Sequence, residues 1–238
     1  MLLESFFSKQ ADQIHYSRQQ ASDFAKEVAG DFNLIHDVDA KMFCVPGDLL
    51  FATVLSQHGL SKKMCFTFSG MVTDGIKLDF TASNAALLTI KDENDKEYLS
   101  VEREGEISHD QALIANLAKS YVAFSGQTFP HILVPLMKEQ GVMINPARPL
   151  VVYQNMAIEL DTLDISNPVL EASDSTLEVN GKRGSASLKF NITESGEVVG
   201  HGKKTIVLSG LREYDQVQID ELVASYNARK QAYQSRAA

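Results

Sequence analysis

The chain has 238 residues, of which 44% are hydrophobic and 22% are charged, and its formal net charge is −9. This is the composition of a globular protein that is long enough to bury a core without disulfide bonds. The negative charge and the lack of any run of basic residues disfavour nucleic acids and anionic membrane surfaces as partners.

The two cysteines, Cys44 and Cys65, both lie in apolar runs, so we expect them to be buried free thiols. No Cys/His spacing typical of a zinc site occurs, and no metal ligand is predicted. The apolar start of the chain, residues 1–7, is too short for a signal peptide or a spanning helix. We therefore expect a cytoplasmic protein that does not enter a membrane.

The first half of the sequence predicts two helices followed by strands. Apolar residues recur at helical spacing over residues 11–29, which predicts an amphipathic helix that Gly30 ends. Residues 45–56 begin with Val45-Pro46 and are apolar on nearly every side, so we expect a buried helix that ends at Gly59. Alternating and β-branched residues then predict strands over residues 64–72, 76–80, 85–90 and 98–101.

The second half repeats this order. Residues 109–124 predict a helix, residues 125–127 a break, and residues 129–137 a second apolar helix that ends near Gly141. A charged, amphipathic helix is expected from Tyr214 onward. Predicted strands cover residues 150–160, 169–177, 185–192 and 198–208, with hairpin turns at Asn180-Gly181 and Ser195-Gly196.

The repeated order predicts two similar units, residues 1–106 and 107–238, in which the helix at Pro130 matches the one at Pro46. A helix that is apolar all round has to be enclosed, and an antiparallel sheet can curl around it. We therefore predict an α+β double hot-dog fold, with two antiparallel sheets each wrapped around a buried central helix. Pairing between the exposed sheet edges would join the units.

One segment resembles a known family. Residues 30–36 read Gly-Asp-Phe-Asn-Leu-Ile-His, which is similar to the Gly-Asp-x-Asn-Pro-Ile-His motif of the MaoC-like dehydratases and (R)-specific enoyl-CoA hydratases. Residues 46–50 are similar to that family's His-Gly-Met-Leu helix start, and residues 196–202 to its closing strands. The sequence departs from the family at Leu34, where the family has proline, and at Pro46, where it often has histidine.

The resemblance implies a hydro-lyase that acts on an acyl thioester such as enoyl-CoA. Asp31 and His36 would be catalytic, and Asn33 would order the turn or the attacking water. The N–H groups near Gly47 would polarise the thioester carbonyl. Asp48 and Ser56 are further candidate substrate-binding residues. No cofactor is expected, although the substrate can carry CoA or a phosphopantetheine arm, and the protein would be a monomer or a homodimer.

The same residues permit simpler interpretations. Gly30-Asp31 can be a helix C-cap and turn, and His36 can be a hydrogen-bonded structural histidine. The fold also hosts acyl-CoA thioesterases, which need a carboxylate near the carbonyl and no partner histidine, and proteins that bind thioesters without turning them over. His131, next to Pro130, is expected to be a helix-start or packing residue rather than a second catalyst.

Overall fold

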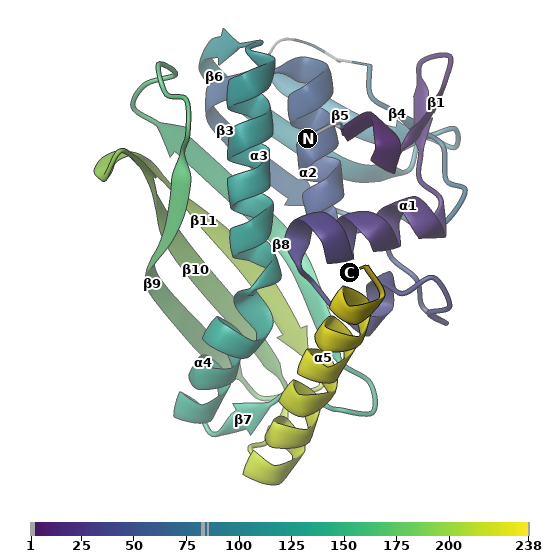
Figure 1. Cartoon of the computed structure of the whole chain (residues 1–238), viewed down its shortest axis with the longest axis vertical. Helices are drawn as coiled ribbons and strands as arrows, with labels where there is room; N and C mark the ends of the chain where they lie inside the picture. Colours follow the sequence, from purple (N-terminus) through teal and green to yellow (C-terminus); the bar gives the residue numbers. More distant parts are fainter. Residues whose placement is uncertain (1–2, 82–83, 85, 238) are drawn as a thin grey trace.

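The computed structural model describes residues 3–81, 84 and 86–237 (Figure 1). The helices are η1 (Leu3–Phe6), α1 (Arg18–Asp23), η2 (Phe24–Ala29), η3 (Leu34–His36), α2 (Gly47–His58), α3 (Gln111–Gly126), η4 (Phe129–Leu133), α4 (Val134–Glu139) and α5 (Gln216–Ala237). Of these, η1 and η3 are 3-10 helices, whereas η2 and η4 are π-helical.

The strands of the first half are β1 (Ser8–Gln10), β2 (Gln13–His15), β3 (Leu60–Phe68), β4 (Leu78–Asp79), β5 (Leu87–Asp92) and β6 (Glu97–Ser108). Those of the second half are β7 (Val142–Met143), β8 (Leu150–Leu160), β9 (Val169–Asn180), β10 (Arg183–Glu194), β11 (Glu197–Ser209) and β12 (Arg212–Glu213). Residue 85, at which one predicted strand begins, lies outside the described residues.

The long strands form one antiparallel sheet of ten strands in the order β1-β2-β4-β5-β6-β3-β8-β11-β10-β9. The two halves of the chain meet where β3 pairs with β8, with Cys65 opposite Ala157. The salt bridge between Lys63 Nζ and Glu159 Oε1, 2.7 Å long, crosses the same junction. The predicted α+β hot-dog fold is confirmed, and the two predicted sheets are joined edge to edge as one. The division into residues 1–106 and 107–238 falls within β6 and stays a prediction.

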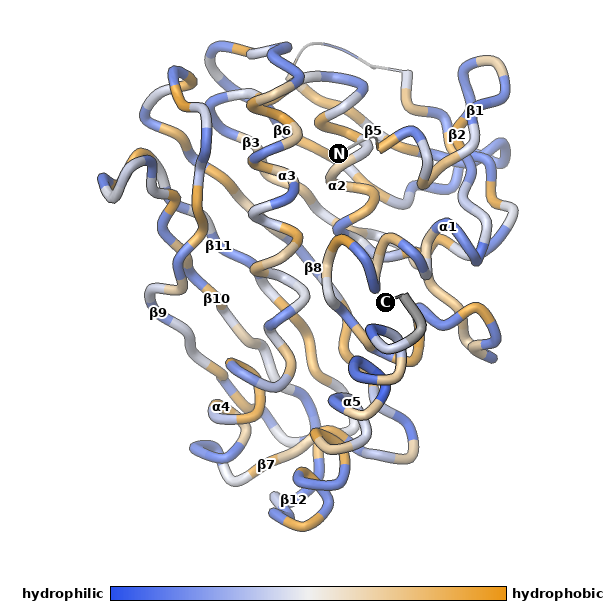
Figure 2. Tube along the Cα trace, viewed as in Figure 1, coloured by the Kyte–Doolittle hydropathy of each residue, from blue (hydrophilic) through white to orange (hydrophobic). Residues whose placement is uncertain are grey.

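The helix α2 is enclosed on all sides, as its sequence predicts. Every residue from Asp48 to Leu55 is buried, and Phe51 is 0% exposed. The Phe51 ring lies 5.1 Å from the ring of Phe66 on β3 and 4.6 Å from that of Tyr121 on α3. The hydrophobic core around α2 includes side chains of β2 to β6, β8 and β10. Figure 1 shows α2 and α3 side by side on one face of the sheet, and Figure 2 shows hydrophobic and hydrophilic residues alternating along the long strands.

The second apolar helix forms at the predicted residues, as η4 and α4, but it is not enclosed as α2 is. In the segment 129–137 only Leu133, Leu136 and Met137 are buried, and His131 and Pro135 are exposed. The helix that packs against α2 is α3, which buries one face through Leu113, Leu117 and Tyr121. It continues through Gly126 without the predicted break, because Ser125 and Gly126 keep helical geometry and η4 follows almost directly. The helical segments that begin near Pro46 and Pro130 therefore occupy corresponding places in the sequence, but only the first is buried.

The first helix begins later than predicted. Residues 8–15 form the β1–β2 hairpin, in which Ala11 has φ 53° and Ile14 is buried as a strand residue. The helix α1 starts after Ser17, whose side chain accepts the Gln20 N–H while the Gln20 side chain accepts the Ser17 N–H. This capping box satisfies first-turn N–H groups, which fixes the start of the helix.

Enclosure of α2 predicts a large loss of stability on truncation of Phe51. Phe51→Ala should lower the free energy of unfolding by about 3–5 kcal/mol, because it leaves a cavity between α2, β3 and α3. Chemical denaturation followed by circular dichroism measures this. Val217→Ala, at a side chain that is 67% exposed, is the matched control and should change stability by less than about 0.5 kcal/mol. Similar losses in both variants would contradict the burial of α2.

Candidate active site

The turn after η2 determines where Asp31 points. The π-helical turn ends at Gly30, which has φ 65° and so adopts the left-handed conformation that glycine favours. The N–H groups of Gly30 and Asp31 both donate to the Ala25 carbonyl oxygen, the latter at 2.8 Å. The helix ends there, and the Asp31 side chain lines a cavity. The expected helix C-cap is therefore present, and it also positions this carboxylate.

Asp31 and His36 converge in one site. Asp31 Oδ1 accepts the Asn33 backbone N–H at 2.9 Å, which leaves Oδ2 facing His36 Nε2 at 3.7 Å. Asn33 also caps η3, because its side-chain oxygen accepts the Ile35 N–H at 3.3 Å. Asn33 thus orders the turn that brings the carboxylate and the imidazole together.

The tautomer of His36 follows from its second contact. His36 Nδ1 lies 2.7 Å from the carbonyl oxygen of Cys44, and a carbonyl can only accept, so Nδ1 carries the proton. In the neutral ring, Nε2 then has a free lone pair that faces Asp31. Two acceptors 3.7 Å apart do not bond to each other, but one donor can be placed between them. His36 is only 8% exposed, so this lone pair is shielded from bulk water.

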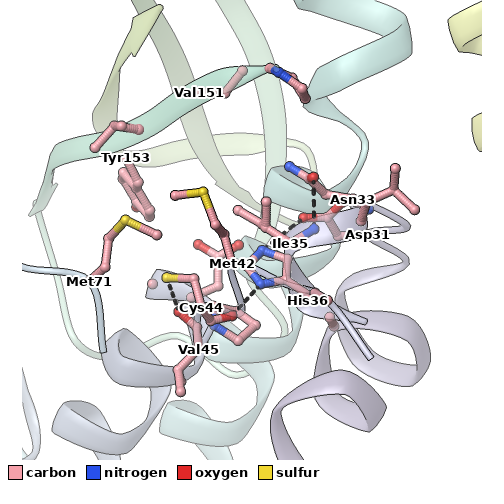
Figure 3. Close-up of a pocket in the computed structure, with 18 of the residues that line it drawn as sticks. Asp31, Asn33, Ile35, His36, Met42, Cys44, Val45, Met71, Val151 and Tyr153 are labelled. Carbon is pink, nitrogen blue, oxygen red and sulfur yellow. Dashed lines mark hydrogen bonds and ion pairs between the residues drawn. The ribbon is translucent and has the colours of Figure 1, made fainter. Parts of the chain in front are cut away.

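A cavity of about 720 Å³ opens in front of this pair (Figure 3). It is lined by five of the six residues that the sequence analysis assigned to catalysis or substrate binding: Asp31, Asn33, His36, Gly47 and Asp48. In Figure 3, Asp31 and His36 lie on one side of the cavity and Met71 and Tyr153 on the other. The size and mixed lining suit a small organic ligand with a few polar groups.

Ser56 does not line this cavity. It is half-buried near the end of α2, about two and a half helical turns from Gly47. The residues of α2 that line the cavity are Gly47, Asp48 and Leu50, all in its first turns, so a residue in the last turn lies too far along the axis. Gly47 lines the cavity, and an added Cβ there would be 2.7 Å from Cδ1 of Tyr153. A larger residue than glycine would therefore collide with that ring.

Five polar residues of the second half also line the cavity: Ser125, Thr128, Arg148, Tyr153 and Lys204. None of them is among the site residues assigned from the sequence. The signal for Lys204 is the alternation of β11, in which Lys204, Ile206 and Leu208 all face the interior and are buried. A lysine at an inward position of a strand is rarely buried unless it is paired or used.

The charged groups of the cavity influence one another. Burial raises the pKa of Asp31 above its ordinary value, whereas His36 and the Asn33 N–H oppose this shift. The charge of Asp48 raises the pKa of Asp31 further, and that of Lys204 lowers it. Burial also raises the pKa of the Cys44 thiol to about 11, so this thiol stays neutral at physiological pH.

The C-terminal helix braces the Asp31 turn. The Tyr226 hydroxyl lies 3.1 Å from the Gly30 carbonyl oxygen and 3.2 Å from that of Gly126, and it accepts the Phe32 N–H at 3.3 Å. Arg229 Nε donates to the Phe32 carbonyl oxygen at 3.2 Å. These contacts join α5 and the end of α3 to the turn that carries the carboxylate, although α5 is about two hundred residues away in sequence (Figure 1).

Comparisons with known proteins bear on the family and the fold. A family model described as "Protein of unknown function (DUF3581)" matches residues 1–217. No protein with a curated description has a matching sequence. No helix in the part of the chain that the structure describes is long and apolar enough to span a membrane.

Several solved structures are similar to the chain. The tesB protein of Mycobacterium avium subs paratuberculosis is 9% identical with a TM-score of 0.49, over 87% of this chain and 96% of that one. A hot-dog protein of unknown function from Alicyclobacillus acidocaldarius is 10% identical with a TM-score of 0.48, over 88% and 98%. A MaoC-like dehydratase is 8% identical with a TM-score of 0.43, over 85% and 97%.

The contacts of the Tyr226 hydroxyl with the backbone of Gly30, Phe32 and Gly126 predict that this hydroxyl stabilises the fold. Tyr226→Phe should lower the free energy of unfolding by about 1–3 kcal/mol, because the Phe32 N–H loses its acceptor while the ring contacts remain. Denaturant unfolding measures the difference. Tyr214→Phe is the control, since the Tyr214 hydroxyl donates only to an exposed Gln216 side chain. A Tyr226→Phe protein as stable as this control would show that the brace contributes nothing.

Proposed function

The chain belongs to the DUF3581 family, and for this member we propose a MaoC-like hydro-lyase activity that adds water to an enoyl thioester or removes it from a 3-hydroxyacyl thioester. One observation carries the proposal: Asp31 Oδ2 and His36 Nε2 lie 3.7 Å apart in one cavity, with the imidazole lone pair facing the carboxyl group. The local sequence around them resembles the hydratase motif, and the distance between the two groups supports the same reaction.

The pair can hold and activate one water molecule. A water placed between Oδ2 and Nε2 donates one proton to Nε2 and accepts the proton of the Asp31 carboxyl group, which leaves its second lone pair for C3 of the substrate. In the hydration direction, the water oxygen bonds to C3 and its proton passes to Nε2. The π electrons of the C2=C3 bond move to C2, which takes a proton from the Asp31 carboxyl group. A proton then passes from His36 back to Asp31, so the net change is addition of one water.

Negative charge develops on the thioester oxygen during this addition. The first N–H groups of a helix have no intrahelical acceptor, and the helix dipole favours negative charge at that end. The start of α2 at Gly47 lies at the cavity, and its two preceding residues, Val45 and Pro46, are buried. We place the thioester carbonyl here, with the CoA or phosphopantetheine arm leaving through the opening. Backbone donors held by a rigid buried helix need no reorganisation in the transition state.

Removing either catalytic group should abolish most of the turnover. With crotonyl-CoA as substrate, Asp31→Asn and His36→Gln should each lower kcat by about 10²- to 10⁴-fold. Loss of the enoyl absorbance measures hydration, and a thiol reagent in a parallel assay detects free CoA. Asp12→Asn and His201→Gln, at exposed positions, are the matched controls and should keep the wild-type rate.

The two assays separate the possible reactions. Hydration without release of a thiol supports the proposal, whereas stoichiometric release of CoA from a saturated acyl-CoA would replace it with hydrolysis. Binding of acyl-CoA with neither reaction would indicate a non-catalytic protein. Wild-type rates in both the Asp31→Asn and the His36→Gln protein would reject the assignment of these residues.

The pH dependence of hydration should be bell-shaped, because the pair works with one shared proton. A second proton would occupy the Nε2 lone pair, and loss of the last proton would leave none for C2. Asp48 raises the pKa of Asp31, so Asp48→Asn should move the alkaline limb of kcat/KM to lower pH. Rates measured in constant-ionic-strength buffers test this. A limb that stays in place or moves to higher pH would contradict the coupling.

A further inference from the structure

A second polar cluster lines the same cavity, and the proposed hydration does not use it. It consists of Asp48, Ser125, Thr128, Tyr153 and Lys204, and we call it the lysine cluster. Asp48 lies on the first turn of α2, Ser125 on α3, Tyr153 on β8 and Lys204 on β11, so four separate elements contribute to it. The other buried positions that follow Lys204 on β11, Ile206 and Leu208, are apolar.

Lys204 is the centre of the cluster and is only 6% exposed. Its ammonium group donates to Ser125 Oγ and lies 4.0 Å from the centroid of the Tyr153 ring. Asp48 Oδ1 is 3.8 Å away, which is close enough for attraction between charges but too far for a hydrogen bond. An ammonium group has three protons to donate, so Lys204 can still donate to a ligand.

Two buried polar atoms of the lysine cluster lack hydrogen bonds. Asp48 is 8% exposed and Thr128 is 4% exposed, and neither Asp48 Oδ1 nor Thr128 Oγ1 has a hydrogen-bond partner among the described residues. Thr128 lies three residues after Ser125 in a helical stretch, so both face the same side. A buried polar atom without a hydrogen bond costs about 1–3 kcal/mol, and a ligand that supplies the bond recovers that free energy.

We infer that the lysine cluster recognises a hydroxyl group on the acyl chain, beyond the carbons that react, so that the substrate is a hydroxylated acyl thioester. The inference rests on the proposed function for the position of the thioester. A hydroxyl accepts from Lys204 and donates to Asp48, whereas a ketone only accepts and an ammonium only donates. An oxygen about 2.8 Å from each fits atoms that are 3.8 Å apart.

The charges of the cluster also favour a neutral group. The positive charge of Lys204 lies 3.8 Å from the negative charge of Asp48, so the pair presents no net charge to a ligand. The rest of the lining carries three further carboxyl groups, those of Asp31, Asp37 and Asp39, and two further cationic groups, those of Lys41 and Arg148. A carboxylate on the acyl chain would meet Asp48 as well as Lys204. An unsubstituted alkyl chain would leave Asp48 Oδ1 and Thr128 Oγ1 without hydrogen bonds, at the cost given above.

Binding of saturated acyl-CoAs tests the inference, because these compounds cannot be hydrated. Isothermal titration calorimetry with the full chain would compare 4-hydroxybutanoyl-, 6-hydroxyhexanoyl- and 8-hydroxyoctanoyl-CoA with the unsubstituted acyl-CoAs of equal length. At one chain length, the hydroxylated compound should bind about tenfold more tightly, as expected for hydrogen bonds to a charged pair. The length with the largest ratio gives the distance between the thioester and the cluster.

Two variants test whether the cluster causes the preference. Asp48→Leu/Lys204→Met replaces both charges by apolar side chains of similar size, which avoids leaving one buried charge alone. It should remove the preference or reverse it. Thr128→Val keeps the shape of the side chain and should reduce the preference by about threefold. This second variant provides the test if the double variant does not fold.

The outcomes separate this inference from the proposed function. A hydroxyl preference that both variants weaken supports the inference even if no thioester is hydrated. Hydration of enoyl-CoA with equal binding of hydroxylated and unsubstituted chains would overturn the inference and leave the proposed function intact. A preference that persists unchanged in both variants would also overturn it, since the hydroxyl would then be recognised elsewhere.

Discussion

The burial of α2 is the constraint on which the arrangement of the molecule depends. A helix with apolar residues on every side gains stability only where each side meets protein, and every residue from Asp48 to Leu55 is buried. The sheet covers one part of this helix and α3 another. Because one antiparallel half-sheet ends at β3, pairing of β3 with β8 both extends the cover and removes an exposed edge.

The same enclosure produces the cavity. The helix α2 is covered along its length, but its first turn meets the turn that carries Asp31 and His36, and the side chains there do not fill the space. Backbone donors at a helix start, a carboxylate and an imidazole are thus brought to one place by a packing requirement. Rigid elements on all sides keep these groups in position, which is what a preorganised site requires.

Long-range contacts, in turn, hold the turn that carries Asp31. An added Cβ at Gly126 would lie 1.8 Å from the Ala29 carbonyl oxygen, so only glycine lets α3 approach η2 this closely. From the other side, Tyr226 and Arg229 of α5 bond to the backbone of Gly30 and Phe32. The position of Asp31 therefore depends on segments that follow it by about a hundred and about two hundred residues.

Local sequence patterns were sufficient for the fold class, the helix at Pro46, most of the strands and the Asp31–His36 segment. Each of these depends on neighbours within a few residues: an all-apolar helix, alternating strand residues, or a glycine followed by a short polar motif. The capping box at Ser17 is also a local signal. The helical spacing of apolar residues continues across the β1–β2 hairpin, so the predicted helix begins before this cap.

Tertiary structure alone decided which helix accompanies α2 and which polar groups share its cavity. Hydrophobicity favoured the segment at Pro130, but the face that α3 presents through Leu117 and Tyr121 packs against α2 instead. Lys204 meets Asp48 only because β11 and the start of α2 come together across 156 positions of sequence. No periodicity encodes such a pairing, since it results from how the sheet and the helices pack as a whole.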